Sequence, residues 1–124
     1  MNIADIISYV DGVLLSPCAN LDTNIKGGFS GDLMSDVLAS IQSESLLITG
    51  LSNPQVVRTA LIADVRLIIF ARGKTPNQDT INLAVAEQLP IVTSKLGLYE
   101  ISSRLAYHGL PSCEIPMDRP FDLA

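Results

Sequence analysis

Three short runs of consecutive apolar residues mark the second half of the chain. They cover residues 46–50, 67–71 and 91–94 and recur at intervals of about 20 to 25 residues. Apolar residues stand next to one another in these runs instead of alternating with polar ones, which is typical of strands buried on both faces. Amphipathic stretches separate the runs. We therefore expect strand–helix–strand units with right-handed crossovers, and hence a parallel sheet.

Helix signals stand between these predicted strands. Asn53 followed by Pro54 combines an N-cap with proline at the first helical position, and Thr75 with Pro76 repeats this pattern. A last helix is expected over 96–108, where Gly109 provides a left-handed terminator.

The N-terminal third is less regular. The pattern predicts a helix over 3–10, a strand over 13–15 and a weaker strand over 21–25. Three glycines within 26–31 predict a tight turn, and a helix follows over 32–41. Three prolines after residue 110 predict an extended tail, so we expect one domain over 1–110 and a tail over 111–124.

Composition narrows the possible classes of protein. The chain has 124 residues, 48% of them apolar, and a net charge of −5, which suits one compact domain and disfavours nucleic-acid and membrane partners. No apolar stretch approaches the ~20 residues of a membrane span. The N-terminus lacks the basic start of a signal peptide, so we expect a cytoplasmic protein. Two cysteines, Cys18 and Cys113, and one histidine predict free thiols, no metal site and no cofactor.

One segment carries a family likeness. Residues 27–38 read Gly-Gly-Phe-Ser-Gly-Asp-Leu-Met-Ser-Asp-Val-Leu. This segment resembles the defining motif of the DRTGG domain family, in which two glycines precede a helix rich in serine and aspartate. Residues 46–50, 73–76 and 89–94 are similar to further segments of the family, and the likeness covers roughly 21–110. The chain departs from the family at 24–26, where Asn-Ile-Lys replaces Asp-Arg-Thr.

The resemblance implies a three-layer α/β/α domain with a mainly parallel central sheet, similar to the N-terminal domain of HPr kinase. It also implies regulation without catalysis. Members of the family stand beside CBS domains in regulated pyrophosphatases, beside acyl-transfer enzymes, or alone, and often at dimer interfaces. We therefore expect a regulatory or ligand-sensing module that forms a homodimer and acts on a partner enzyme or a CBS-domain protein.

The position of a ligand follows from the expected sheet. Ligands of open parallel sheets bind beyond the carboxyl ends of the strands. Small hydroxyl, amide and cationic residues follow the three predicted strands. Positive charge at one edge of an acidic chain favours an anionic metabolite or a nucleotide. The predicted ligand-binding residues are Gly27, Gly28, Asp32, Thr49, Gly50, Asn53, Arg72, Gly73, Lys74 and Ser94.

Several of these residues have a second, structural interpretation. Gly27 and Gly28 either cradle a phosphate or form a tight turn under the sheet. Gly73 with Lys74 ends like a P-loop, but Ile68 stands where that motif needs glycine, so this turn holds at most one anionic group or is simply solvated. Asp32 and Asp36, one helical turn apart, either bind Mg²⁺ or support the helix start.

Apolar residues in excess predict an interface. The mean hydropathy of +0.35 is high for an acidic chain of this size, and the helix over 32–41 has a wide apolar stripe. The expected homodimer surface consists of Leu33, Met34, Val37, Leu38 and Ile41. Two other functions stay open: a protein-interaction adaptor without a small ligand, and a small phosphotransferase that uses Lys74 and Asp36.

Overall fold

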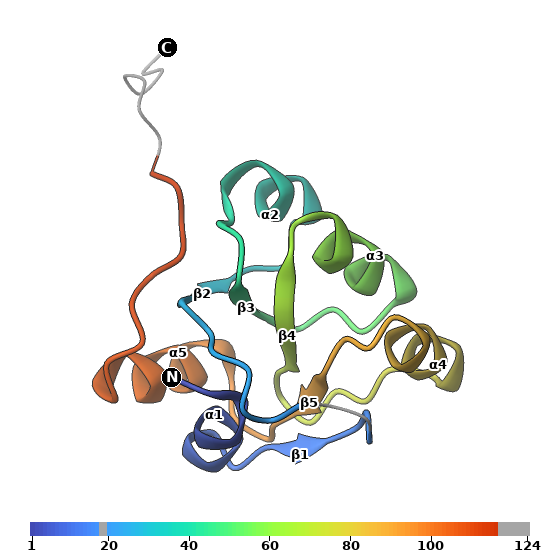
Figure 1. Ribbon diagram of the computed structural model, residues 1–124, viewed down its shortest axis with the longest axis horizontal. Coiled ribbons are helices and arrows are strands. Elements are labelled where there is room, and N and C mark those ends of the chain that lie inside the picture. Colours follow the sequence, from blue (N-terminus) through green and yellow to red (C-terminus); the bar gives the residue numbers. More distant parts are fainter. Residues whose placement is uncertain (18–19, 117–124) are drawn as a thin grey trace.

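A five-stranded sheet forms the centre of the computed structural model, which describes residues 1–17 and 20–116 (Figure 1). In spatial order the strands are β1 (Val13–Leu14), β5 (Ile91–Thr93), β4 (Val65–Phe70), β3 (Ser45–Thr49) and β2 (Gly27–Ser30). The helices are α1 (Ile3–Tyr9), α2 (Met34–Ser40), α3 (Pro54–Ile62), α4 (Gln78–Ala86) and α5 (Leu98–Tyr107).

The sheet is mainly parallel, as the sequence predicted. β2, β3, β4 and β5 run in the same direction, and only the two-residue β1 is antiparallel, pairing with β5 at one edge. The three predicted apolar runs correspond to β3, β4 and β5. Every residue of β3 is buried, which agrees with a strand covered on both faces.

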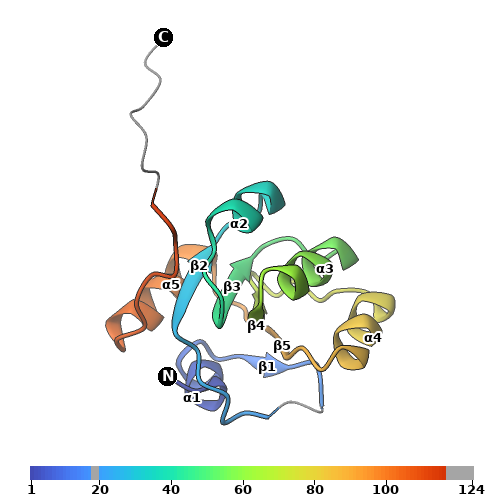
Figure 2. The same ribbon diagram turned by 45° about the horizontal axis from the view of Figure 1, so that its top comes forward.

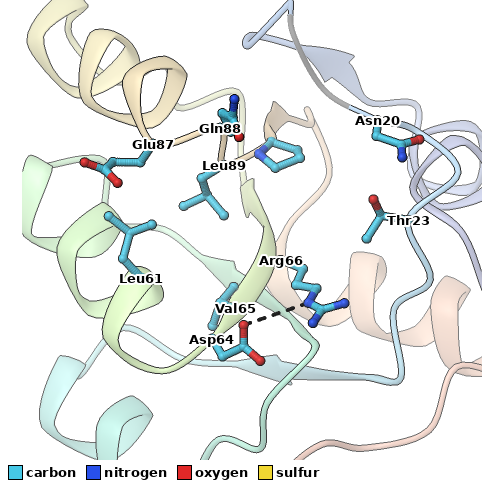
Figure 3. A pocket seen from close by; sticks show the side chains of 10 residues that line it. Asn20, Thr23, Leu61, Asp64, Val65, Arg66, Glu87, Gln88 and Leu89 are labelled. Carbon is cyan, nitrogen blue, oxygen red and sulfur yellow. Dashed lines mark ion pairs between the residues drawn. The ribbon is translucent and has the colours of Figure 1, made fainter.

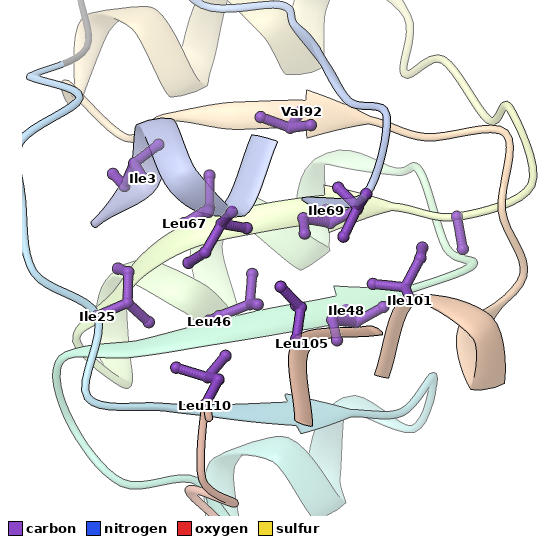
Figure 4. Packing of buried hydrophobic residues seen from close by; sticks show 13 residues of the cluster. Ile3, Ile25, Leu46, Ile48, Leu67, Ile69, Val92, Ile101, Leu105 and Leu110 are labelled. Atoms are coloured by element: carbon purple, nitrogen blue, oxygen red, sulfur yellow. The ribbon is translucent and has the colours of Figure 1, made fainter. Parts of the chain in front are cut away.

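Helices cover both faces of the sheet, so the domain has three layers (Figure 2). Leu46, Ile48, Leu67 and Ile69 belong to the hydrophobic cluster that includes α1 and α5 (Figure 4). The alternate residues of the same strands, such as Leu47 and Ile68, point to the opposite cluster with α2, α3 and α4. Alternation of side chains along each strand thus divides one apolar run between two cores.

Three expected elements differ in the structure. Residues 26–31 do not form a tight turn, because Gly27–Ser30 is the strand β2. The helix expected after Thr75 begins only at Gln78, since the Asn77 side chain accepts hydrogen bonds from the backbone and hydroxyl of Thr80. Residues 21–25 form an irregular segment with a single β-bridge at Asn24.

The segment 111–115 packs along the outer edge of β2. The Gly28 N–H donates to the Pro111 carbonyl at 2.9 Å, and the Cys113 N–H donates to the Gly28 carbonyl at 2.8 Å. The Cys113 carbonyl then accepts from Gln42 N–H. Cys113 is a free thiol, and burial raises its pKa. The rest of the predicted tail from residue 117, and Cys18, lie outside the described residues.

No helix within the described residues is long and apolar enough to span a bilayer.

This packing leaves no room for a side chain at Gly27, whereas Gly28 has room for one. A Cβ at Gly27 would lie 2.9 Å from the Pro111 carbonyl oxygen, whereas one at Gly28 would lie 3.4 Å from the flexible end of Leu110. We expect Gly27→Ala to lower the free energy of unfolding by about 1 to 3 kcal/mol, and Gly28→Ala by less than about 1 kcal/mol. Urea denaturation measures both. Equal losses for the two variants would contradict the close approach of segment 111–115 to Gly27.

Candidate functional site

The carboxyl ends of four parallel strands meet at one edge of the sheet. The loop after β2 brings Asp32 to this edge, the loop after β3 brings Gly50, and the loop after β4 brings Arg72, Gly73 and Lys74. Lys95 follows β5. We call this set of six residues the carboxyl-terminal rim. Five of the six are predicted ligand-binding residues that the structure brings together, and Lys95 is the sixth.

Asp32 is tied to the end of β3. Its Oδ1 accepts a hydrogen bond from the Thr49 hydroxyl at 2.8 Å and another from the Gly50 N–H at 2.7 Å. Thr49 is buried and its hydroxyl is used by this contact, so Thr49 supports the rim and is not itself accessible to a ligand. Asp32 does not begin α2, because the N-cap of that helix is Leu33. The carboxylate therefore holds two strand ends together.

The loop after β4 has an unusual backbone. Arg72 and Gly73 both have positive φ angles, of 60° and 69°. A left-handed conformation is costly for arginine, so the surrounding contacts must hold it in place. The Arg72 N–H donates to the Leu96 carbonyl at 2.8 Å, and the Gly73 N–H donates to the Ser94 carbonyl at 2.7 Å. These bonds fasten the loop to the end of β5.

The cations of the rim are free of ion pairs. Arg72, Lys74 and Lys95 are exposed, and none forms a salt bridge with another residue in the described part of the chain. By contrast, Lys26, Arg66 and Arg104 all pair with carboxylates. Three positive charges that form no ion pair within the described residues, and the one negative charge of Asp32, thus lie at one edge of a chain whose net charge is −5. This edge can attract a small anion.

Four predicted ligand residues have structural partners elsewhere. Gly27 and Gly28 lie in β2 against the segment 111–115, away from the carboxyl end of that strand. The Asn53 side chain caps α3 by accepting from the Val56 N–H. The Ser94 hydroxyl is buried and donates to the Val10 carbonyl at 2.7 Å.

Some of the residues expected at a dimer surface are buried in the core of the domain, and others are exposed. Val37 is fully buried and Ile41 is 7% exposed, so both belong to the core of the domain and are not available to a partner. Met34 is partly buried against the same core. Leu33 and Leu38 are 61% and 48% exposed, and they form the outward part of the stripe.

A cleft lies at the opposite edge of the sheet, near the starts of β4 and β5 (Figure 3). It has a volume of about 520 Å³, and Asn20, Thr23, Arg66 and Gln88 are among its lining residues. Arg66 pairs there with Asp64 and with Glu44, and the pairing of Glu44 with Lys26 and Arg66 lowers the pKa of that carboxyl. Since the cation in this cleft is already compensated, free positive charge and cavity volume occur at different edges.

A smaller cavity of about 190 Å³ separates β2 from α5 and the segment 110–114. Phe29, Leu105 and Leu110 contribute to its mostly apolar wall. Rim residues line neither of these two cavities.

Sequence reasoning missed the contact of Asp32 with Thr49 and Gly50, because it joins residues 17 and 18 positions apart. Lys95 had a detectable signal, since it directly follows the third apolar run.

Comparison with known proteins gives one family and one fold. The profile of the DRTGG domain matches residues 5–107. The crystal structure of the CBS and DRTGG domains from the regulatory region of Clostridium perfringens pyrophosphatase, complexed with its activator diadenosine tetraphosphate, superposes with a TM-score of 0.65. The two are 15% identical over 95% of this chain, which spans about half (51%) of the solved chain. No curated protein matches significantly.

Proposed function

This chain belongs to the DRTGG domain family, and we propose that it is a non-catalytic regulatory module that senses an anionic metabolite or nucleotide. This proposal rests on Arg72, Lys74 and Lys95 at the carboxyl-terminal rim, three exposed cations that form no ion pair within residues 1–17 and 20–116. Positive charge without an internal partner, on an otherwise acidic chain, is suited to an external anion. We expect the protein to act in the cytoplasm.

The solved relative supports this class of ligand. It is a regulatory region in complex with diadenosine tetraphosphate, a molecule with two nucleosides and several phosphate charges. We propose that the present domain likewise responds to a phosphorylated compound and regulates a partner enzyme or a CBS-domain protein. The rim would supply the contacts to the phosphate groups.

The geometry also suggests how binding is transmitted. Asp32 leads directly to Leu33, the N-cap of α2, and Leu33 and Leu38 are exposed on that helix. We propose that these two leucines form part of a homodimer surface. A ligand that changes the environment of Asp32 would then act on the start of α2 and on the surface beside it. The rim and the proposed interface are therefore joined by a single loop.

Removing rim cations should weaken binding of a simple polyanion. We expect ADP and inorganic pyrophosphate to raise the unfolding temperature of the protein, with about 2.7 kcal/mol of stabilisation at a hundredfold excess over the dissociation constant. Arg72→Gly removes a charge and suits the left-handed backbone, and Lys74→Gln removes a second charge. Each should weaken pyrophosphate binding roughly fivefold in isothermal titration calorimetry at low salt.

Arg58→Gln is the matched control, because Arg58 is an exposed cation halfway along α3 that forms no ion pair with the residues the structure describes. It should leave pyrophosphate affinity unchanged. If no phosphorylated compound shifts the unfolding temperature, the ligand-sensing proposal is wrong and the adaptor function is favoured. If Arg58→Gln weakens binding as much as Lys74→Gln, the rim is not the site.

A charge on α2 should separate the proposed dimer. We expect the wild-type protein to sediment at about twice its chain mass of 13.3 kDa, and Leu38→Glu to sediment as a monomer. Leu38 is already 48% exposed, so the variant should keep its circular dichroism spectrum. Tyr99→Glu adds the same charge at an 86% exposed residue of α5, on the other helix layer, and should remain dimeric. A monomeric wild type would contradict the proposal.

A further inference from the structure

The two carboxylate oxygens of Asp32 differ in their hydrogen bonds within the described residues. Oδ1 accepts from the Thr49 hydroxyl and from the Gly50 N–H, and these bonds fix the carboxylate over the end of β3. Oδ2 accepts no hydrogen bond within the described part of the chain. An exposed carboxylate oxygen held in a fixed position is a ready acceptor for a donor from outside.

Gly50 leaves the space beside this oxygen open. A Cβ at Gly50 would lie 3.4 Å from Asp32 Oδ2 and 3.6 Å from Oδ1, in van der Waals contact with both, so a side chain there would occupy space beside the carboxylate. The φ angle of Gly50 is not positive, so its backbone does not require glycine. Glycine at this position therefore leaves the surroundings of the Asp32 carboxylate open without being needed for the turn.

A carboxylate at this position repels phosphate and selects donors. The Gly50 N–H and the Thr49 hydroxyl are the groups that would otherwise bind an anion at the end of β3, and Asp32 already occupies both. A phosphate is thus directed to the neighbouring strand end. Hydroxyl groups of the same ligand can reach Oδ2, because each hydroxyl is a hydrogen-bond donor.

The spacing of the strands puts the two kinds of contact within one small molecule. Thr49 lies opposite Phe70 in the sheet, and its carbonyl accepts from the Ala71 N–H at 2.9 Å, directly before Arg72. The backbone at the end of β3, to which Asp32 is bound, and the backbone that leads to Arg72 after β4 are therefore neighbours, and adjacent strands of a sheet lie about 5 Å apart. This is the scale of the separation between the sugar hydroxyls and the phosphates of a nucleotide.

We infer that Asp32 and Gly50 form a subsite for the hydroxyl groups of a ribonucleotide, whose phosphates lie against Arg72 and Lys74. The inference rests on the proposed function, because it names the ligand class of the same rim. In dinucleotide-binding folds, which are also built on an open parallel sheet, an acidic side chain accepts a hydrogen bond from a ribose hydroxyl. The rim then distinguishes ribonucleotides from other phosphorylated compounds, and Asp32 determines the direction in which the ligand lies.

Calorimetric titration of the full chain with three probes tests this subsite: ADP, 2′-deoxy-ADP and inorganic pyrophosphate. Loss of one hydrogen bond to a charged group weakens binding about tenfold or more, so wild type should bind ADP at least about tenfold more tightly than 2′-deoxy-ADP. Asp32→Asn retains an oxygen for Thr49 and Gly50 but replaces the free acceptor with a donor. This variant should bind the two nucleotides equally and should bind pyrophosphate at least as well as wild type.

Two further variants separate recognition from charge and from folding. Asp36→Asn makes the same change of charge on α2, in a residue that does not contact Gly50, and should keep the preference for ADP. Gly50→Ala keeps Asp32 and covers Oδ2, so it should lose the preference while pyrophosphate binding persists. Thermal unfolding of each variant confirms that it is folded.

The outcomes distinguish failure of the hydroxyl subsite from failure of the whole anion-binding site. Equal affinity of wild type for ADP and 2′-deoxy-ADP, or a preference that persists in Asp32→Asn, would overturn the hydroxyl subsite while the anion-sensing function stands. If none of the three probes binds, the proposed function fails, and the subsite fails with it.

Discussion

Burial of β3, β4 and β5 on both faces is the constraint on which the rest of the structure depends. Runs such as Leu46-Leu47-Ile48 place alternate side chains in two separate cores, so helices must cover both sides of the sheet. Covering both sides requires strand–helix crossovers, and these make the strands parallel. Parallel strands end at one edge. The polar residues that follow them are gathered there although they are distant in sequence.

Local patterns predicted the elements that this constraint governs. The apolar runs, the Asn53 cap and the end of α5 at Gly109 agree with the structure, because each depends on neighbouring residues. The edge of the sheet was harder to predict. β2 contains two glycines in four residues and resembles a turn, and it is a strand because β3 and the segment 111–115 supply its hydrogen-bond partners. Contacts of that kind leave no local signal.

The candidate site, like the fold, was predictable from the sequence only where a residue's role depends on its neighbours along the chain. Arg72 and Lys74 could be assigned to the rim because they directly follow an apolar run. The contacts of Asp32 could not, since they depend on hydrogen bonds to the end of the next strand, where Asp32 occupies the Thr49 hydroxyl and the Gly50 N–H. Ser94 and Asn53 have suitable side chains, but packing and helix capping use them internally.

The central claim is that recognition occurs at the edge where the parallel strands end and not in the cleft at the opposite edge. Mapping of backbone amide shifts by NMR during titration with ADP tests it most directly. The account predicts that the resonances of Gly50, Gly73 and Lys95 move as the ligand binds. Movement of Arg66 and Gln88 in the cleft, with the rim unchanged, would contradict it.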